Sequence, residues 1–392
     1  MRQASAELFP TNEPVPASQM IGRERDVQEL TSRLENGLHL WLAGPRRTGK
    51  TSVCDAVLTR CQADGHYIAK VDLFRVGDAA ELAETLAVQV IRNRSTTHRL
   101  VRATRKAGRA ALSAAQATAV LKLGQELGEG VEIALSPGLA AEDPQRALDA
   151  ALRLPEAVAK ADRKRLVLFF DEFQEVASER KPYGDPDALT KRMRAIFQRT
   201  SSVSYLFAGS IEHVMRDLFG PSDRAFSGFG EFYELGTIDE DAWRGGLVER
   251  YAVDGCRIAD PALGRLIELG AGHPRATMLV AQQAHLMSVQ LETTDISADL
   301  VELAFQRAIA GDRPTMEQTV ESIRGLHRQA LAVARGLATG HPPQSRLHPG
   351  VRDRVLKRLQ RAGVVEHVAR GDWRIINPLL RAYLAELDPL RP

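Results

Sequence analysis

The feature that most constrains the fold is a stretch that satisfies the pattern G-x-x-x-x-G-K-[ST]. It follows Leu38–Ala43, whose apolar residues predict a short buried strand, and it precedes a segment with helical patterning. Glycines let the backbone approach an anion closely, and the N-terminus of a helix attracts negative charge. The order strand, loop, helix therefore predicts a phosphate-binding loop. The loop consists of Gly44, Pro45, Arg46, Arg47, Thr48, Gly49, Lys50 and Thr51, with Ser52 directly after it.

Two side chains of the loop have specific expected roles. We expect Lys50 to meet the β- and γ-phosphates of ATP and the Thr51 hydroxyl to ligate Mg²⁺. A chance glycine-rich turn would explain the pattern without any ligand. The complete eight-residue pattern in its strand–loop–helix context favours the phosphate loop, which predicts ATP and Mg²⁺ as cofactors.

The second informative segment is Leu166–Phe170, an apolar run followed by Asp171 and Glu172. A buried strand of this kind would deliver both carboxylates to the carboxyl edge of a parallel sheet, where the phosphate loop is also expected. We expect Asp171 to hold Mg²⁺ through water and Glu172 to polarise the water that attacks the γ-phosphate. An acidic pair that caps a helix is the alternative. The upstream phosphate loop favours the functional interpretation, which predicts hydrolysis of ATP to ADP and phosphate.

Further apolar segments predict the rest of the sheet. Tyr67–Phe74 and Val203–Ala208 are typical of strands, and Phe232–Leu235 is expected to be the last strand of the core. Helical stretches separate these strands, as in repeated βα units. The fold class is therefore predicted as α/β, with a parallel sheet that helices bury on both faces.

The length of 392 residues exceeds the usual size of one hydrophobic core. After residue 235 the strand signals stop, and Asp260 is expected to be a helix N-cap with Pro261 at the first helical position. Near the end, two helices, two extended segments around a turn and a last helix after Asn377 describe a winged helix. We predict a leader at 1–20, a P-loop ATPase core at 21–235, a helical lid at 236–310, a linker at 311–324 and a winged helix at 325–392.

Composition indicates the setting of the chain. With 44 % hydrophobic and 26 % charged residues, it is an ordinary globular protein. The three cysteines form no CxxC pair and no cluster with histidines at ligand spacing, so neither a disulfide framework nor a zinc site is indicated. No signal peptide or apolar run of membrane-spanning length is visible, so we expect a cytoplasmic protein that does not enter membranes.

Two basic regions bear on partners, and the first is a long stretch without acids. No acidic residue lies between Glu84 and Glu126, whereas Arg102 and Arg105 fall within this stretch. Such a stretch suits a nucleic-acid backbone or an acidic protein partner. A solvated helix face is the plainer alternative.

The second basic region lies on a helix of the predicted winged helix. Its apolar residues Val351, Val355, Leu356 and Leu359 face one way, and a cationic stripe at i, i+3, i+4 and i+7 faces the other. The stripe consists of Arg354, Lys357, Arg358 and Arg361. It suits a DNA major groove or the flanking phosphates, with Arg370 and Arg374 on the wing beside the minor groove. Protein contact is the alternative, because winged helices also serve as protein-contact modules.

Taken together, these motifs resemble the P-loop ATPases of the archaeal-ATPase type, on the border of the AAA+ and STAND classes. The likeness extends over nearly the whole chain, and the phosphate loop and acidic strand are its specific parts. Its carriers are Ile21-Gly22-Arg23-Glu24, Gly44–Thr51, Asp171-Glu172-Phe173-Gln174, Gly209-Ser210, Gly272-His273-Pro274 and Asn377-Pro378-Leu379-Leu380.

The resemblance implies roles for further positions. The adenine and ribose would be lined by Ile21, Gly22 and Arg23. Ser210 would stand at the sensor-1 position, where AAA+ motors commonly have Asn. The nucleotide would be read from the lid by His273, Pro274 or Arg275. Gly272-His273-Pro274 is similar to the lid signature of STAND switches, whereas Arg275 would be an AAA+ sensor-2 arginine, and His273 also suits a helix cap.

Arg224 precedes the last expected core strand, where this class of ATPase often places an arginine finger. That role requires ATP-bound homo-oligomers, because the arginine would have to reach a neighbouring subunit's ATP. An arginine on a solvated loop is the alternative.

Two functions remain open from sequence. In the first, the chain is an ATP-dependent switch or loader on DNA, and the nucleotide repositions the winged helix. In the second, it is a STAND-like signalling switch whose winged helix and basic insert contact proteins and not DNA. No protease, nuclease or transferase constellation stands out, so we expect the chain to act through a protein partner.

Overall fold

The computed structural model describes residues 4–11, 14–44, 47–94, 142–178, 183–220, 223–340, 347–369 and 372–387. The chain divides into two compact units. The sheet unit comprises Arg25–Ala43 and Val53–Glu234, and the helical unit comprises Met1–Glu24, Gly44–Ser52 and Leu235–Pro392. Because the chain enters and leaves the sheet unit twice, neither unit is one continuous segment.

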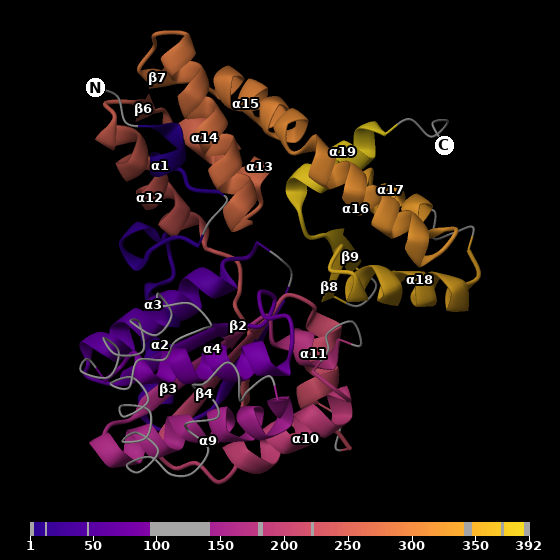
Figure 1. Cartoon of the computed structure of the whole chain (residues 1–392). Coiled ribbons are helices and arrows are strands. Elements are labelled where there is room, and N and C mark those ends of the chain that lie inside the picture. The colour runs from indigo at the N-terminus through magenta and orange to yellow at the C-terminus, as the bar shows by residue number, and fades with distance from the viewer. Residues whose placement is uncertain are drawn as a thin grey trace. The chain divides into compact units, whose positions relative to one another are not determined.

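A five-stranded sheet forms the centre of the sheet unit (Figure 1). Its strands are β1 (Leu40–Ala43), β2 (Tyr67–Asp72), β3 (Leu166–Asp171), β4 (Val203–Gly209) and β5 (Glu231–Tyr233). They follow the order β2-β3-β4-β1-β5, and every neighbouring pair is parallel. The predicted α/β class and parallel sheet are confirmed, and the strand ends differ from the expected ones by one or two residues.

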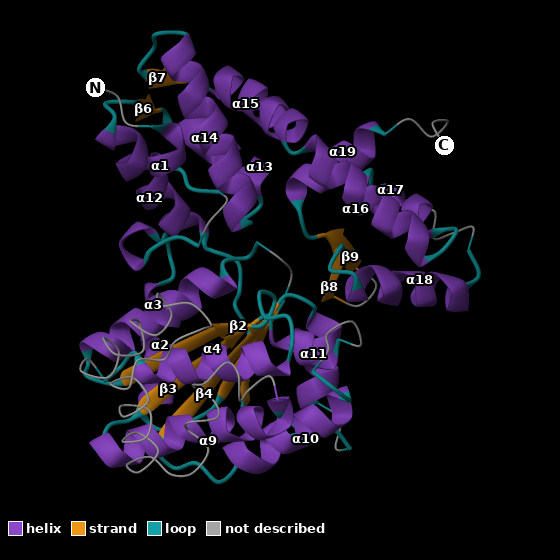
Figure 2. Ribbon diagram, in the orientation of Figure 1, coloured by secondary structure: helices purple, strands orange, loops and turns teal. Residues whose placement is uncertain are grey.

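Helices flank the sheet, as Figure 2 shows with the strands in orange and the helices in purple. The described helices that lie wholly or mostly in this unit are α2 (Glu24–Glu35), α3 (Lys50–Ala63), α4 (Ala79–Ile91), α9 (Pro144–Asp162), α10 (Pro186–Phe197) and α11 (Glu212–Phe219). On one face of the sheet, Phe170 and Phe207 stack with ring centroids 5.8 Å apart, in a core that includes residues of α4, α9 and α10. On the other face, the Ser204 hydroxyl donates to the Leu34 carbonyl of α2 at 2.6 Å. Strands β3 and β4 are therefore buried along their whole length, as their continuous apolar runs predicted.

The register of the strands aligns three carboxyl ends. Ala43, the last residue of β1, pairs with Gly209, the last residue of β4, and Phe170 of β3 pairs with Phe207 of β4. In a parallel sheet all strands point the same way, so these ends lie at one edge. The phosphate loop, Asp171-Glu172 and Ser210 each begin at or directly after one of these strand ends.

The helical unit begins with five helices between residues 240 and 326. They are α12 (Glu240–Val253), α13 (Asp260–Gly270), α14 (Pro274–Gln290), α15 (Ala298–Gly311) and α16 (Arg313–Leu326). The expectation that strands would be absent here is wrong, because β6 (Arg257–Ile258) pairs in parallel with β7 (Asp295–Ile296). Strands of two residues are too short to leave an alternating pattern in the sequence. Among the described residues, no helix of either unit is long and apolar enough to cross a membrane.

The predicted N-cap at Asp260 is also wrong. Helix α13 begins at Asp260 itself, Ala259 occupies the N-cap position, and no side chain caps the helix. The Asp260 carboxylate instead accepts a hydrogen bond from Arg244 of α12 at 2.7 Å. The Asp260 carboxylate therefore pairs with Arg244 of another helix and does not cap α13.

The N-terminal leader belongs to the core of the helical unit. It includes α1 (Ser5–Leu8) and a 3-10 turn at Ala17–Gln19. Phe9 is fully buried, with its ring centroid 4.9 Å from that of Tyr251 on α12. Gln282 of α14 donates to the Phe9 carbonyl at 2.9 Å. Aromatic contact with α12 and a hydrogen bond from α14 therefore hold the leader in place.

The C-terminal part contains the elements expected there from sequence. They are α17 (Ala330–Ala338), α18 (Pro349–Arg361), β8 (Val365–Ala369), β9 (Asp372–Ile375) and α19 (Pro378–Glu386). Strands β8 and β9 are antiparallel, and the Asn377 side chain caps α19. Residues 311–324, predicted as a linker, lie mostly in α16. The assignment of these elements to a winged helix stays a prediction.

Candidate functional site

The phosphate loop follows β1 and leads into α3 at Lys50. Gly49 has a φ of 90° and Arg47 a φ of 68°, so both residues adopt left-handed backbone conformations. Glycine does so without steric cost, whereas for Arg47 the cost is on the order of 1 kcal/mol. The loop therefore contains strained backbone at Arg47, where the phosphate is expected. Pro45 and Arg46 lie outside the described residues.

Lys50 is buried, and its ammonium group bonds within the loop. Nζ donates to the Gly44 carbonyl at 2.9 Å and to the Thr48 hydroxyl at 3.4 Å. Thr51 and Ser52 follow on the first turn of α3, and the Ser52 hydroxyl accepts from the backbone N–H of Val15 at 2.9 Å. The loop thus combines one enclosed positive charge with hydroxyl groups at a helix N-terminus, a set that suits phosphate and a hard cation.

Asp171 and Glu172 lie where β3 ends. Asp171 is 7 % exposed, and its Oδ1 accepts from the backbone N–H of Glu172 at 3.1 Å. Glu172 adopts a left-handed conformation, with φ of 51°, and opens the 3-10 turn at Phe173–Ala177. For a residue with a side chain this conformation carries a strain of about 1 kcal/mol or more, which is frequent at functional sites.

Two neutral donors converge on one oxygen of Glu172. The Ser210 hydroxyl donates to Glu172 Oε2 at 2.6 Å, and the Gln174 side-chain amide donates to the same oxygen. Ser210 directly follows β4, so the pairing of β3 with β4 brings it to Glu172. Sequence reasoning assigned no role to Gln174, although it belongs to the same motif as Glu172. Glu172 and Gln174 are only two residues apart in this motif, and a tight turn at this spacing would place their side chains together.

The residues expected to line the adenine and ribose lie beside a cavity of the helical unit. Gly22 has a φ of 65°, and a Cβ at this position would lie 2.7 Å from the Cβ of Ala242 on α12, so only glycine fits. Arg23 is buried and donates to the Gly236 carbonyl at 2.7 Å. A cavity of about 500 Å³ is lined by Ile21 and Gly22, together with residues of α12 and the leader.

His273 stands at the N-terminus of α14, followed by Pro274 in the first turn. Its Nδ1 accepts from the backbone N–H of Ala276 at 3.2 Å, so His273 caps the helix, which was one of the expected alternatives. Burial, with a smaller effect from the positive charges of Arg275 and Arg47, lowers the pKa of His273 to about 4. His273 is therefore neutral at pH 7 and acts there as a hydrogen-bond acceptor.

Arg275 lies in the first turn of the same helix and is 12 % exposed. Its Nη1 and Nη2 donate to the two carboxylate oxygens of Asp312, each at 2.9 Å. Sequence reasoning missed Asp312, because 37 residues separate the two partners and no motif marks the acid. The arginine expected to read the nucleotide is thus held by a fixed acidic partner.

Arg224 lies in the turns before β5 and is about half exposed. Its Nη1 is 3.5 Å from Oδ1 of Asp187, which lies in the first turn of α10. An exposed pair at this distance contributes little to stability, so Arg224 can exchange this partner for another.

The cationic stripe of α18 is exposed, and the apolar residues Val355, Leu356 and Leu359 on the opposite side are buried. Cations of the stripe interact with other groups of the chain. Lys357 pairs with Asp353 at 2.9 Å, and Arg358 donates to the Leu326 carbonyl at 2.6 Å. The other predicted nucleic-acid contacts, Arg102, Arg105 and Arg370, lie outside the described residues.

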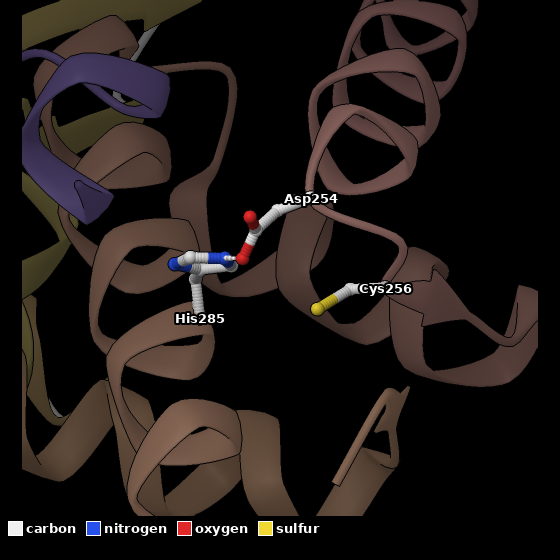
Figure 3. A group of neighbouring side chains, drawn as sticks. All are labelled: Asp254, Cys256 and His285. Carbon is white, nitrogen blue, oxygen red and sulfur yellow. Dashed lines mark hydrogen bonds and ion pairs between the residues drawn. The ribbon is translucent and has the colours of Figure 1, made fainter. Parts of the chain in front are cut away.

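A separate group of ligand-type side chains lies in the helical unit, where Asp254, Cys256 and His285 place their polar atoms within 4.8 Å of one another (Figure 3). Both ring nitrogens of His285 take part in hydrogen bonds: Nε2 with Asp254 at 3.0 Å and Nδ1 with the Ser5 hydroxyl at 2.8 Å. These bonds connect α1, α14 and the end of α12. They account for the polar groups of His285 without a metal, so we assign the group a structural role.

Comparison with known proteins places this geometry in a family. Residues 19–207 match the family described as the AAA ATPase domain. Over these residues the chain matches an AAA-type P-loop ATPase domain. The resemblance that the phosphate loop and the acidic strand indicated is thereby confirmed.

Solved structures with a similar fold cover most of the chain. A Walker-type ATPase of Pyrococcus abyssi matches with a TM-score of 0.71 and 15 % identity, covering 96 % of this chain and 99 % of that one. The ORC2 protein of Aeropyrum pernix, in ADPNP–ADP complexes, matches with a TM-score of 0.58 and 16 % identity, covering 98 % of this chain and 97 % of that one. A comparison with curated proteins found no match. At these identities the likeness concerns the fold of the AAA-type ATPase alone.

Proposed function

We propose that the chain binds ATP with Mg²⁺ and hydrolyses it to ADP and phosphate. The observation that carries this proposal is the Glu172 carboxylate, which Ser210 and Gln174 hold at the edge of the sheet. A carboxylate fixed by two donors is held in one direction, as a group that orients an attacking water must be. The match to the AAA ATPase domain family supports the nucleotide as the ligand.

The oxygen donors expected to hold magnesium fit that ion in type. Mg²⁺ prefers carboxylate and hydroxyl oxygens together with water and phosphate oxygens. Asp171 offers a carboxylate at the end of β3, and Thr51 offers a hydroxyl on the first turn of α3. Bound there, the ion would neutralise negative charge on the phosphate oxygens.

Each of the other site residues is proposed to act on a different part of the nucleotide. Lys50 binds the β- and γ-phosphates, because its ammonium group is the charge enclosed by the loop. Glu172 orients the water that attacks the γ-phosphate. Ile21 and Gly22 hold the adenine, since the cavity that they line has enough room for a base. Arg275 contacts the phosphates from the helical unit.

A test of the nucleotide site is calorimetric titration of the full chain with ATP. Wild type should bind, and Lys50→Ala should lose binding while its circular dichroism spectrum stays unchanged. Lys160→Ala is a suitable control, because Lys160 is an exposed lysine that pairs with Glu156 on α9. Equal ATP affinity in wild type and Lys50→Ala would refute the site.

We further propose that the ATPase acts as a nucleotide-controlled switch or loader on DNA. The support is the exposed stripe of α18, in which Arg354, Lys357, Arg358 and Arg361 lie opposite a buried apolar face. Cations arranged in this way suit the DNA backbone, and their contacts would be strongly salt-dependent. The ORC2 name of one structural neighbour is compatible with this role and does not decide it.

A second candidate is a STAND-like signalling switch whose C-terminal elements contact protein. It is favoured by the engagement of Lys357 and Arg358 within the chain, which reduces the charge available to DNA. Binding to duplex DNA, measured at several salt concentrations with and without ATP, separates the two functions. A steep loss of affinity with salt supports the DNA function, and no binding under any condition supports the signalling switch.

Arg224 is proposed to act as an arginine finger in an ATP-bound homo-oligomer. Its exposure and its weak pair with Asp187 leave it able to reach a neighbouring subunit. Arg224→Ala should then lower hydrolysis only at protein concentrations where subunits assemble. A defect that does not depend on concentration would place its action within its own subunit.

A further inference from the structure

Asp312 lies between α15 and α16 and is buried, with 7 % exposure. Its two carboxylate oxygens accept parallel hydrogen bonds from Arg275, Nη1 to Oδ2 and Nη2 to Oδ1, each at 2.9 Å. Two parallel bonds fix both the position and the plane of a guanidinium group. Asp312 therefore holds Arg275 in one orientation.

The same carboxylate also faces the phosphate loop. Nη1 of Arg47 lies 3.9 Å from Asp312 Oδ2. One acid thus stands between two guanidinium groups, one from the loop and one from the first turn of α14. The pKa of His273 agrees with this arrangement, because the charges of both arginines lower it in addition to burial.

Two cations held close together repel each other, and each has several rotatable bonds. A carboxylate between them offsets the repulsion and restricts both side chains before any ligand arrives. Restriction of this kind improves binding, because less freedom is lost when the ligand is bound. In the bidentate pair Arg275 uses two of its five N–H groups, so the other three remain for phosphate oxygens.

We propose that Asp312 is a positioning residue of the ATP site, which orients Arg275 and Arg47 toward the terminal phosphate. This role rests on the nucleotide site proposed above. It predicts that Asp312 matters more for ATP than for ADP, because only ATP has the phosphate that the two arginines are placed to meet. Asp312 does not itself contact the nucleotide.

The test measures the dissociation constants of ATP and ADP for the full chain and its Asp312→Asn variant. Asparagine keeps the size of the side chain but provides one acceptor and no charge. We expect ATP affinity to fall by about tenfold, as for the loss of one charge-assisted hydrogen bond, and ADP affinity to fall less. Asp312→Glu should restore part of the difference, because it returns the charge.

The matched control is Asp162→Asn. Asp162 accepts from Arg94 Nε at 2.6 Å and forms a second bond with Arg94 Nη2, so this pair has the same chemistry and similar burial. It lies at the end of α9, before the amino end of β3, which is the sheet edge opposite the acidic pair. ATP and ADP affinities of Asp162→Asn should equal those of wild type.

Several outcomes would overturn the role of Asp312. Unchanged ATP affinity in Asp312→Asn, or equal losses for ATP and ADP, would mean that the ion pair is only structural. Arg275→Gln should reproduce the selective loss of ATP affinity, so an unchanged value there contradicts the proposal even if Asp312→Asn fails to fold. Failure of the nucleotide site itself would be recognised separately, because Lys50→Ala would then bind ATP as tightly as wild type.

Discussion

The two units hold functional clusters of opposite charge and fix them by different means. In the sheet unit, the acid Glu172 is held by the neutral donors Ser210 and Gln174. In the helical unit, the cation Arg275 is held by the acid Asp312 in a buried ion pair. The donors to Glu172 carry no charge, whereas the partner of Arg275 is a carboxylate.

This difference agrees with what each cluster is proposed to do. A carboxylate that orients water needs its full charge, and two hydrogen bonds direct it without removing that charge. Cations that receive a phosphate repel one another, and an acid between them offsets that repulsion. Breaking the first cluster should therefore affect turnover, and breaking the second should affect the choice of nucleotide.

The largest expected effect is on turnover in Glu172→Gln. Glutamine keeps the shape of the side chain but cannot accept the proton of the attacking water, so we expect hydrolysis to fall by about 10²-fold or more with ATP affinity unchanged. Steady-state phosphate release and calorimetric titration measure the two quantities. Glu175→Gln, in the same 3-10 turn, is the control. If Glu172→Gln turns over normally, another residue handles the water.

A smaller effect is expected from the donors that hold Glu172. Ser210→Ala and Gln174→Leu each remove one hydrogen bond to Oε2, so turnover should fall by about tenfold in each. Because both donors act on one oxygen, the double variant should lose less than the product of the single losses. Multiplicative losses would show that Ser210 and Gln174 act independently of each other.

Acid should destabilise the helical unit through His273. Its pKa is lowered to about 4 in the folded chain from a usual value of 6.5, so its contribution to stability is present above pH 6.5 and is lost as the pH falls toward 4. The full shift corresponds to about 3 kcal/mol. Thermal unfolding between pH 7 and pH 4 measures it.

His39 in the sheet unit complicates this measurement, because burial and the charge of Arg194 also lower its pKa to about 4. The variant His273→Asn keeps a side chain that caps helices well and removes the titrating group. Its stability should therefore depend less steeply on pH than that of wild type. An identical pH profile would mean that His273 is not the source.

The smallest effect on stability is expected on α18. Changing Arg354 and Arg358 to Gln leaves the buried residues Val355 and Leu359 in place, so the melting temperature should move little. DNA binding should become less salt-dependent, by about 0.9 in the slope of log affinity against log salt for each phosphate that the variant no longer neutralises. Arg265 and Arg307, exposed or partly exposed on α13 and α15, supply a control pair for the same substitutions. Equal slopes in both double variants would contradict the proposed stripe.

Sequence predicted features that depend on local order. The apolar runs that became β3 and β4 were recognised because both faces of these strands are buried. The phosphate loop and Asp171-Glu172 were recognised because their residues are adjacent in sequence. The helix that carries Val351, Val355 and Leu359 and the two extended segments around a turn were also predicted, and they correspond to α18, β8 and β9.

Features that depend on tertiary contact were not predicted. Ser210 lies 38 residues from Glu172, and only the pairing of β3 with β4 brings them together. Arg275 and Asp312 likewise meet through the packing of helices. Asp260 had the local signal of a cap, but Arg244 on another helix took its carboxylate. Partners of functional residues thus require the fold, even where the residues themselves are evident.

The leader gives the chain a particular mechanical response. Phe9 is enclosed beside Tyr251, Ser5 bonds to His285 on α14, and Val15 bonds to Ser52 on the first turn of α3. Force applied to the N-terminus would therefore load α14 and the helix that follows the phosphate loop before it reached the strands. A tether attached at the N-terminus would pull on these two helices first.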